Sequence, residues 1–192
     1  MEKRCMDIKA HLVTAWEQTL AFFAPLIIIT LAMFALWFIS FGILTPVTLA
    51  GYTQSLLRML REKRPPEVGD LFAFMNLFLP LLGFSILVVL AVMIGFVLLV
   101  LPGILIGFFI SFTCLYMLPL MTDQKLGLLA AIKKSYAMGV RQGSLGDHFV
   151  VVVIYVAITT IGSSVFIGSL FTQPLATVFL LSVYDEKIMQ TA

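Results

Sequence analysis

The clearest pair of residues that could carry out acid–base chemistry in this sequence is Asp147-His148. General acid–base catalysis often uses a carboxylate together with an imidazole. Neighbouring residues on a helix point about 100° apart, however, so these two side chains would not face each other. Both also lie at the end of an apolar segment, where water and lipid headgroups solvate charged groups. An interfacial lipid-modifying enzyme that uses this pair is therefore the last of three functional hypotheses.

Neutral polar side chains in the last third of the chain form a second group that could contact a ligand. Hydroxyl and amide groups commonly hold apolar helices together at their contacts. The same groups can line a polar cleft between two helices, and we expect any such cleft between the last two apolar segments, near Gln173. The candidate ligand-binding residues are Thr159, Ser163, Thr172, Gln173 and Thr177.

Sequence motifs for other chemistries are absent. The chain has no H-E-x-x-H, G-x-S-x-G or Walker-type phosphate loop. Its two cysteines, Cys5 and Cys114, form neither a metal-ligand spacing nor a disulfide framework. We therefore predict no catalytic residue, no metal and no cofactor, and we expect no nucleic-acid partner.

The composition is that of a membrane protein. Of the 192 residues, 61% are hydrophobic and 11% are charged, and the mean hydropathy is +1.09. A soluble domain has about 25% charged residues, so this chain has too few to cover a water-exposed surface. We predict an all-α integral membrane protein with a single transmembrane domain over residues 1–192.

Three long runs without Asp, Glu, Lys, Arg or His set the number of spans, namely 18–57, 71–122 and 149–184. One spanning helix needs about 20 apolar residues, so each run is too long for one span and suits two. Proline is favoured at the start of a helix and disfavoured in its interior. We therefore predict turns or hinges at Pro46, Pro102-Gly103 and Pro174. The predicted helices are 19–41, 45–60, 77–100, 103–121, 146–162 and 169–184, paired as hairpins over 19–60, 77–121 and 146–184.

The distribution of lysine and arginine agrees with six transmembrane helices. All 12 basic residues fall in four segments, and six spans place these segments on one side, which the positive-inside rule makes cytoplasmic. Both termini are then cytoplasmic. An amphipathic stretch precedes each hairpin, over 5–17, 66–76 and 126–140, and we predict three interfacial helices there. In the third, Lys133 and Lys134 are expected to contact anionic lipid headgroups.

Segment 45–60 is the least typical of the six predicted spans. Its centre, Gly51-Tyr52-Thr53-Gln54-Ser55, is polar for a helix that faces lipid. We expect it either to be buried against neighbouring helices or to cross the membrane only in part.

Residues 68–185 resemble a broad group of bacterial multi-pass membrane proteins. The shared features are Leu101-Pro102-Gly103-Ile104, Pro119, Ala131 with Ser135 four residues on, and Pro174. The group includes the membrane domain attached to some glycerophosphodiester phosphodiesterases and related uncharacterised families. The resemblance implies a six-span protein of the bacterial inner membrane. It does not imply phosphodiesterase activity, because that chemistry belongs to a separate soluble domain that these residues do not contain.

Two non-enzymatic hypotheses rank above the enzyme. The first is a scaffold or accessory protein that acts on lipids or membrane partners, since the predicted spans carry no ionisable group in their interior. The second is a transporter or flippase-like carrier of an apolar or amphipathic molecule, with the five polar residues in its cleft and the prolines as hinges. The expected partners are membrane lipids, with a membrane protein or a second copy of the chain as further possibilities.

Overall fold

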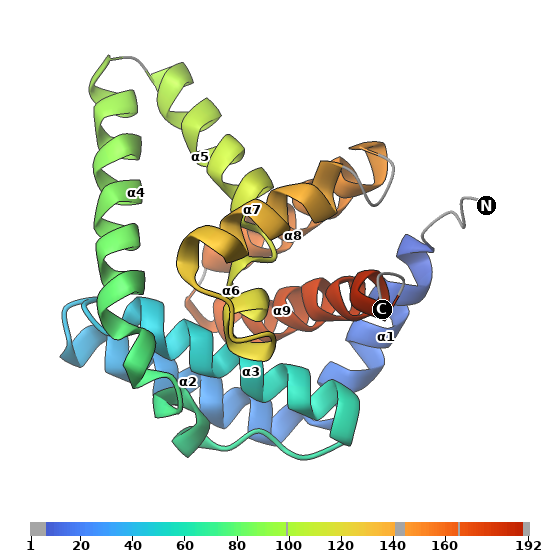
Figure 1. Ribbon diagram of the computed structural model, residues 1–192. Coiled ribbons are helices and arrows are strands. Elements are labelled where there is room, and N and C mark those ends of the chain that lie inside the picture. Colours follow the sequence, from blue (N-terminus) through green and yellow to red (C-terminus); the bar gives the residue numbers. More distant parts are fainter. Residues whose placement is uncertain (1–6, 99, 141–144, 165, 190–192) are drawn as a thin grey trace.

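A computed structural model of the chain describes residues 7–98, 100–140, 145–164 and 166–189, and every regular element in these ranges is helical (Figure 1). The prediction of an all-α fold is confirmed. In chain order the elements are α1 (Ile8–Ala21), α2 (Phe23–Ile39), α3 (Thr45–Glu62), the short 3-10 helices η1 (Val68–Phe72) and η2 (Met75–Leu77), α4 (Phe78–Leu98), α5 (Val100–Cys114), α6 (Met117–Asp123), α7 (Leu128–Val140), α8 (Leu145–Ser163) and α9 (Phe166–Met189).

A sharp bend at Phe22 divides the first predicted span, 19–41. The axes of α1 and α2 differ by 88°. Pro25 explains the bend, because it has no N–H for the carbonyl of Ala21 and its ring clashes with that carbonyl. The helix predicted over 19–41 is therefore confirmed over 23–39 as α2, whereas residues 19–21 belong to α1. α1 itself covers most of the amphipathic stretch predicted over 5–17, of which residues 5 and 6 lie outside the described part of the chain.

The helix predicted over 103–121 is also broken, between α5 and α6. Pro119 cannot donate a hydrogen bond to the carbonyl of Leu115, four residues earlier, and this interrupts the helix. The backbone N–H of Tyr116 instead donates to Ser135 Oγ of α7, at 3.1 Å. Tyr116 and Ser135 are both fully buried. The prediction of a continuous helix is wrong here. The backbone N–H that the break leaves without a helical partner binds the side chain of Ser135 instead.

The prolines predicted at turns or hinges occupy three different settings. Pro46 lies in the first turn of α3, as predicted. Pro102 and Gly103 lie in the first turn of α5, so this pair opens α5 but does not close α4. Pro174 lies inside α9, well after the turn that follows Ser163. A turn at Pro174 is therefore wrong, while a hinge at that position stays a prediction.

α4 and α5 form a hairpin that extends away from the rest of the fold (Figure 1). Two glycines allow its helices to approach closely near the tip. A Cβ atom at Gly95 would lie 2.9 Å from Gly103 Cα, and one at Gly103 would lie 2.7 Å from the ring of Phe96. Any larger residue at either position would push the two helices apart.

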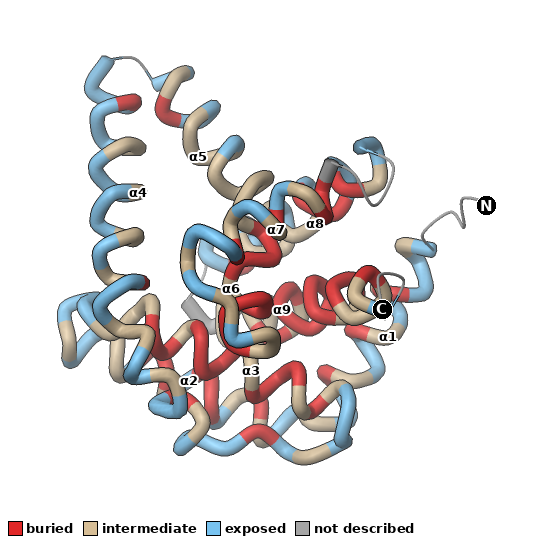
Figure 2. The backbone as a smooth tube through the Cα atoms, viewed as in Figure 1, coloured by how far each residue is buried: buried red, intermediate tan, exposed pale blue. Residues whose placement is uncertain are grey.

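The centre of the fold is built from α3 and α9, which carry many of the buried residues in Figure 2. Tyr52, Leu56 and Phe179 are fully buried there. The η1 helix crosses α3 at Gly51, where a Cβ atom would lie 2.6 Å from the Leu71 carbonyl oxygen. The expectation that segment 45–60 is buried against its neighbours is thus confirmed.

Several helices are suited to a membrane by length and composition. Among the residues that the structure describes, three segments are long and apolar enough to cross one, namely Val68–Leu98, Val100–Asp123 and Leu145–Ser163. The bent pair of α1 and α2 makes a fourth if it is one span. The hairpin of α4 and α5 exposes large hydrophobic side chains, among them Val97 and Leu101. These features are compatible with a membrane protein. Helical elements also precede each predicted hairpin, namely α1, η1 with η2, and α7.

Candidate ligand-binding site

Four of the five predicted ligand-binding residues line one cavity of about 520 Å³, which we call the large cavity. Thr159 and Ser163 come from the end of α8, and Thr172 and Gln173 come from the first half of α9. The fold brings these two helix ends together because α8 and α9 form a hairpin that packs along its length. The fifth residue, Thr177, lies outside the large cavity.

Aromatic side chains of α2 form an apolar wall of the large cavity. They are Phe34, Trp37 and Phe38. The rings of Phe34 and Trp37 have centroids 5.1 Å apart. Trp37 Nε1 donates to Thr48 Oγ1 of α3 at 2.9 Å, which fixes the indole in place. Sequence analysis missed this wall, although Phe34 and Trp37 are three residues apart and therefore share a helix face.

The hydroxyl groups of the polar wall act as hydrogen-bond acceptors toward the cavity. Thr159 Oγ1 donates to the Tyr155 carbonyl at 2.9 Å, and Thr172 Oγ1 donates to the Gly168 carbonyl at 3.1 Å. Ser163 Oγ likewise donates to a carbonyl of its own helix, at 2.9 Å. Since each hydroxyl has one proton, only its lone pairs remain for a ligand. An aromatic wall facing such acceptors suits an amphipathic molecule with hydrogen-bond donors.

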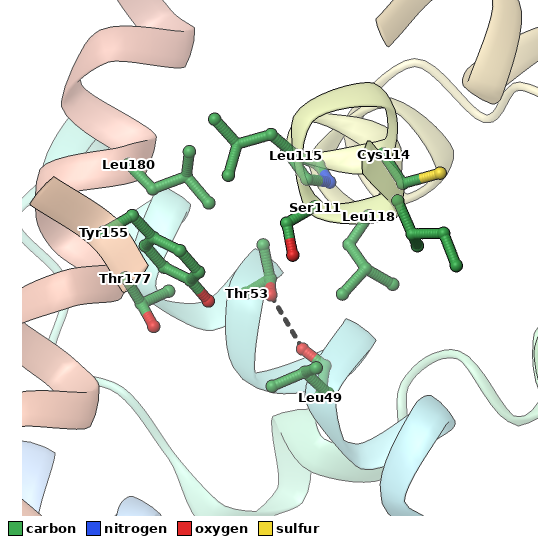
Figure 3. A pocket seen from close by; sticks show the side chains of 11 residues that line it. Leu49, Thr53, Ser111, Cys114, Leu115, Leu118, Tyr155, Thr177 and Leu180 are labelled. Atoms are coloured by element: carbon green, nitrogen blue, oxygen red, sulfur yellow. Dashed lines mark hydrogen bonds between the residues drawn. The ribbon is translucent and has the colours of Figure 1, made fainter. Parts of the chain in front are cut away.

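Thr177 lines a second cavity of about 170 Å³ at the centre of the fold, which we call the small cavity (Figure 3). Thr53 of α3, Ser111 of α5 and Tyr155 of α8 also line it. The hydroxyls of Thr53, Ser111 and Thr177 each donate to the carbonyl four residues earlier in their own helix, at 2.8–2.9 Å. Since each hydroxyl has donated its one proton to its own helix, it can only accept a further hydrogen bond.

An ionic cluster joins the ends of α3, α6 and α9, and we call it the arginine cluster. The Arg61 guanidinium binds both carboxylate oxygens of Asp123, at 2.7 and 3.1 Å. Its Nε donates to Asp185 Oδ1 at 2.8 Å. The hydroxyl of Tyr184 donates to Asp123 Oδ2 at 3.1 Å.

The two carboxylates determine the electrostatics of Arg61. Partial burial alone lowers its pKa, but the hydrogen bonds to Asp123 and Asp185 outweigh this and raise the pKa above its usual value. The arginine is therefore always charged. Sequence analysis did not predict the cluster. The available signal was position, because each of these three charged residues lies close to the end of one of the three charge-free runs.

His148 is fully buried, in contrast to the expectation that solvent reaches it. Its Nε2 lies 2.9 Å from the Phe112 carbonyl oxygen, so this nitrogen carries a proton and donates it. The imidazole packs between Phe112 and Tyr116, with ring centroids 4.4 and 5.6 Å away. Its Nδ1 has no hydrogen-bond partner, so the structure does not join the imidazole to Asp147.

A second histidine, His11, connects α1 to α9. Its Nδ1 lies 2.7 Å from Ser182 Oγ, and its Nε2 lies 2.6 Å from Glu186 Oε2. The order serine, histidine, carboxylate is that of a hydrolase triad. Ser182 lies within α9, however, where the backbone N–H groups are used by the helix and cannot form an oxyanion hole. The geometry is that of a tie between two helices.

The two lysines predicted to contact lipid headgroups differ in their surroundings on α7. Lys133 is exposed. Leu129 and Tyr136 are exposed as well and share its helix face, being four and three residues away. Lys134 instead donates to Gln124 Oε1 at 2.5 Å, in the segment that precedes α7. Lys133 is thus the better placed of the two to contact a headgroup.

The chain matches no known family model, no curated protein and no solved structure. The resemblance to the membrane domain of glycerophosphodiester phosphodiesterases therefore stays a prediction. The function of the protein is therefore inferred from the geometry of the cavities and of the arginine cluster.

Proposed function

We propose that this protein is a non-enzymatic membrane protein that holds one amphipathic molecule, such as a lipid, in the large cavity. The observation that carries the proposal is the cavity itself, with aromatic side chains on one wall and hydrogen-bond acceptors on the other. Its volume of about 520 Å³ lies within the range of 300–1,000 Å³ that is typical of small-molecule sites. With a lipid bound in this cavity, the protein would act as an accessory that presents or organises the lipid in its membrane.

We further propose the topology of six spans in three hairpins, in the bacterial inner membrane with both termini in the cytoplasm. The position of the basic residues supports this orientation, because six spans place all of them on one side. The exposed face of α7 also fits the headgroup plane. Leu129 and Tyr136 would enter the lipid there, and Lys133 would meet anionic headgroups, a contact of about 1 kcal/mol.

Native mass spectrometry of the protein in lipid nanodiscs tests the proposed ligand. The expected result is one reproducible amphiphile in the wild type and its loss in the double variant Thr159→Val/Gln173→Leu. Thr160→Val is a matched control, because Thr160 is the next residue of α8 and is exposed outside the large cavity. Equal retention of the amphiphile in all three proteins, or bulk lipid alone in the wild type, would overturn the proposal.

A further inference from the structure

We propose that the large cavity, the small cavity and the arginine cluster form one translocation pathway for a small neutral molecule that bears hydroxyl or amide donors. In this pathway the arginine cluster is the closed gate on the basic side of the protein. The inference rests on the proposed function and narrows the ligand of the large cavity to an amphipathic molecule small enough to enter the small cavity, which has a volume of about 170 Å³.

The two cavities follow each other along the same two helices. On α8, Thr159 lines the large cavity and Tyr155, four residues earlier, lines the small one. On α9, Gln173 lines the large cavity and Thr177, four residues later, lines the small one. Four residues make about one helical turn, or 6 Å. A molecule leaving the large cavity therefore meets the small cavity one turn further in.

The lining of the two cavities suits a neutral molecule that bears hydroxyl or amide groups. Thr53, Ser111 and Thr177 use their protons within their own helices and offer lone pairs. The Tyr155 hydroxyl points toward the same space in Figure 3. None of the described residues that line the two cavities is Asp, Glu, Lys or Arg. A charged solute would find no counter-ion there, whereas hydroxyl or amide donors would find acceptors.

Tyr184 connects the small cavity to the arginine cluster. Pro119 of α6 lines the small cavity, and its carbonyl oxygen lies 3.5 Å from the Tyr184 hydroxyl. The same hydroxyl donates to Asp123 at 3.1 Å. Arg61 holds Asp123 and is itself about a third exposed, so the cluster lies between the small cavity and the surface. Releasing Asp123 from Arg61 would free the end of the short helix α6 and open the pathway.

Thiol labelling from the two sides of a membrane tests this gate without a known substrate. The reporter is Thr177→Cys in a chain with Cys5→Ser and Cys114→Ser, reconstituted in liposomes. The probe is a neutral, membrane-impermeant methanethiosulfonate that carries a sugar, added to one side at a time. We expect the reporter to react from the side of the large cavity only. With Arg61→Gln added, we expect the rate from the basic side to rise about tenfold, as the open state gains population.

Two further variants make the test specific. Arg58→Gln is the matched control, because Arg58 lies one turn earlier on α3 but pairs with Asp70 outside the cluster. It should leave the basic-side rate unchanged. Tyr184→Phe removes one oxygen between Pro119 and Asp123, and it should raise the basic-side rate even if Arg61→Gln does not fold.

The gate is overturned if the reporter reacts equally from both sides in the presence of Arg61. It is also overturned if neither Arg61→Gln nor Tyr184→Phe accelerates basic-side labelling, or if Arg58→Gln accelerates it equally. The labelling experiment does not require a bound lipid. If it shows no gate while nanodiscs still contain the bound amphiphile, the translocation pathway is overturned and the proposed ligand is not. If the wild type holds no reproducible amphiphile but the labelling shows the gate, the proposed ligand alone is overturned.

Discussion

Gly162 of α8 lies directly against Thr172 of α9, and no side chain fits between the two helices at this point. A Cβ atom at Gly162 would overlap Thr172 Oγ1 and lie 2.5 Å from Thr172 Cβ. Since Thr172 lines the large cavity, this contact also determines how closely the polar wall is packed. We expect Gly162→Ala to lower the free energy of unfolding by about 1–3 kcal/mol, because overpacking outweighs the gain in helix propensity.

Thermal unfolding in nanodiscs measures this effect, and Gly107→Ala is its control. Gly107 lies within α5, and nothing lies within 4 Å of a Cβ atom placed there. Gly107→Ala should therefore raise the free energy of unfolding by up to about 1 kcal/mol through helix propensity. The double variant Gly162→Ala/Thr172→Ala should recover most of the loss. Equal effects at the two glycines would contradict the close contact.

Ser135 supplies the hydrogen bond that the break before α6 requires. Its Oγ accepts from the Tyr116 N–H at 3.1 Å, in a fully buried setting. Ser135→Ala leaves that N–H without this partner, and we expect a loss of about 1–3 kcal/mol in the free energy of unfolding. Ser85→Ala is the comparison, since Ser85 Oγ only donates to the Leu82 carbonyl of its own helix. A similar small effect in both variants would show that the break does not depend on Ser135.

The sequence predicted the helices well where the signal is local. The charge-free runs gave the helical segments, and Pro46 marked the start of α3 as proline chemistry requires. The bends at Phe22 and before α6 were missed, although Pro25 and Pro119 were visible. A break in an apolar helix requires other groups to bind the backbone N–H and carbonyl groups that lose their helical partners. At Tyr116 that group is Ser135, which is 19 residues away, and no local pattern reveals such a partner.

The candidate site was predicted in part for the same reason. Thr159, Ser163, Thr172 and Gln173 lie on two helices that follow each other in the chain, so their meeting could be inferred. The arginine cluster joins residues 62 and 124 positions apart. Charge counting placed Arg61 and Asp185 on one side of the membrane. Charge counting cannot show that these two residues pair, because their pairing depends on the packing of α3 against α9.

The arginine cluster should contribute to stability as well as to gating. Arg61→Gln leaves Asp123 and Asp185 close together without their cation. We expect a loss of about 1–2 kcal/mol in the free energy of unfolding, less than for a fully buried pair because Arg61 is about a third exposed. Arg64→Gln should change the melting temperature little, since its partner Glu67 is mostly exposed and its contact with Asp70 is long, at 3.7 Å, and is also made by Arg58. A larger effect at Arg64 would contradict this ranking.

Lys187 makes the stability of the fold depend on pH in the alkaline range. The residue is only 6% exposed, and its Nζ donates to the Met138 carbonyl at 3.2 Å and lies 5.1 Å from the Tyr116 ring centroid. Burial lowers the pKa of this amine from 10.5 to about 8, although the carboxylates of Asp147 and Glu186 act in the opposite direction. The folded protein therefore gives up this proton at a lower pH than the unfolded chain does.

Between about pH 8 and pH 10 Lys187 keeps its proton in the unfolded chain but loses it in the folded protein, so the contribution of this residue to stability rises with pH in this window. We expect the melting temperature in nanodiscs to increase from pH 7.5 to pH 8.5, below most of the range in which cysteine and tyrosine side chains ionise in an unfolded chain. In Lys187→Met this increase should disappear, and the variant should be the more stable protein at pH 7, where the wild type buries a charge. Lys133→Met removes an exposed lysine of α7 and should keep the increase. A rise that survives in Lys187→Met would assign the titration to another group.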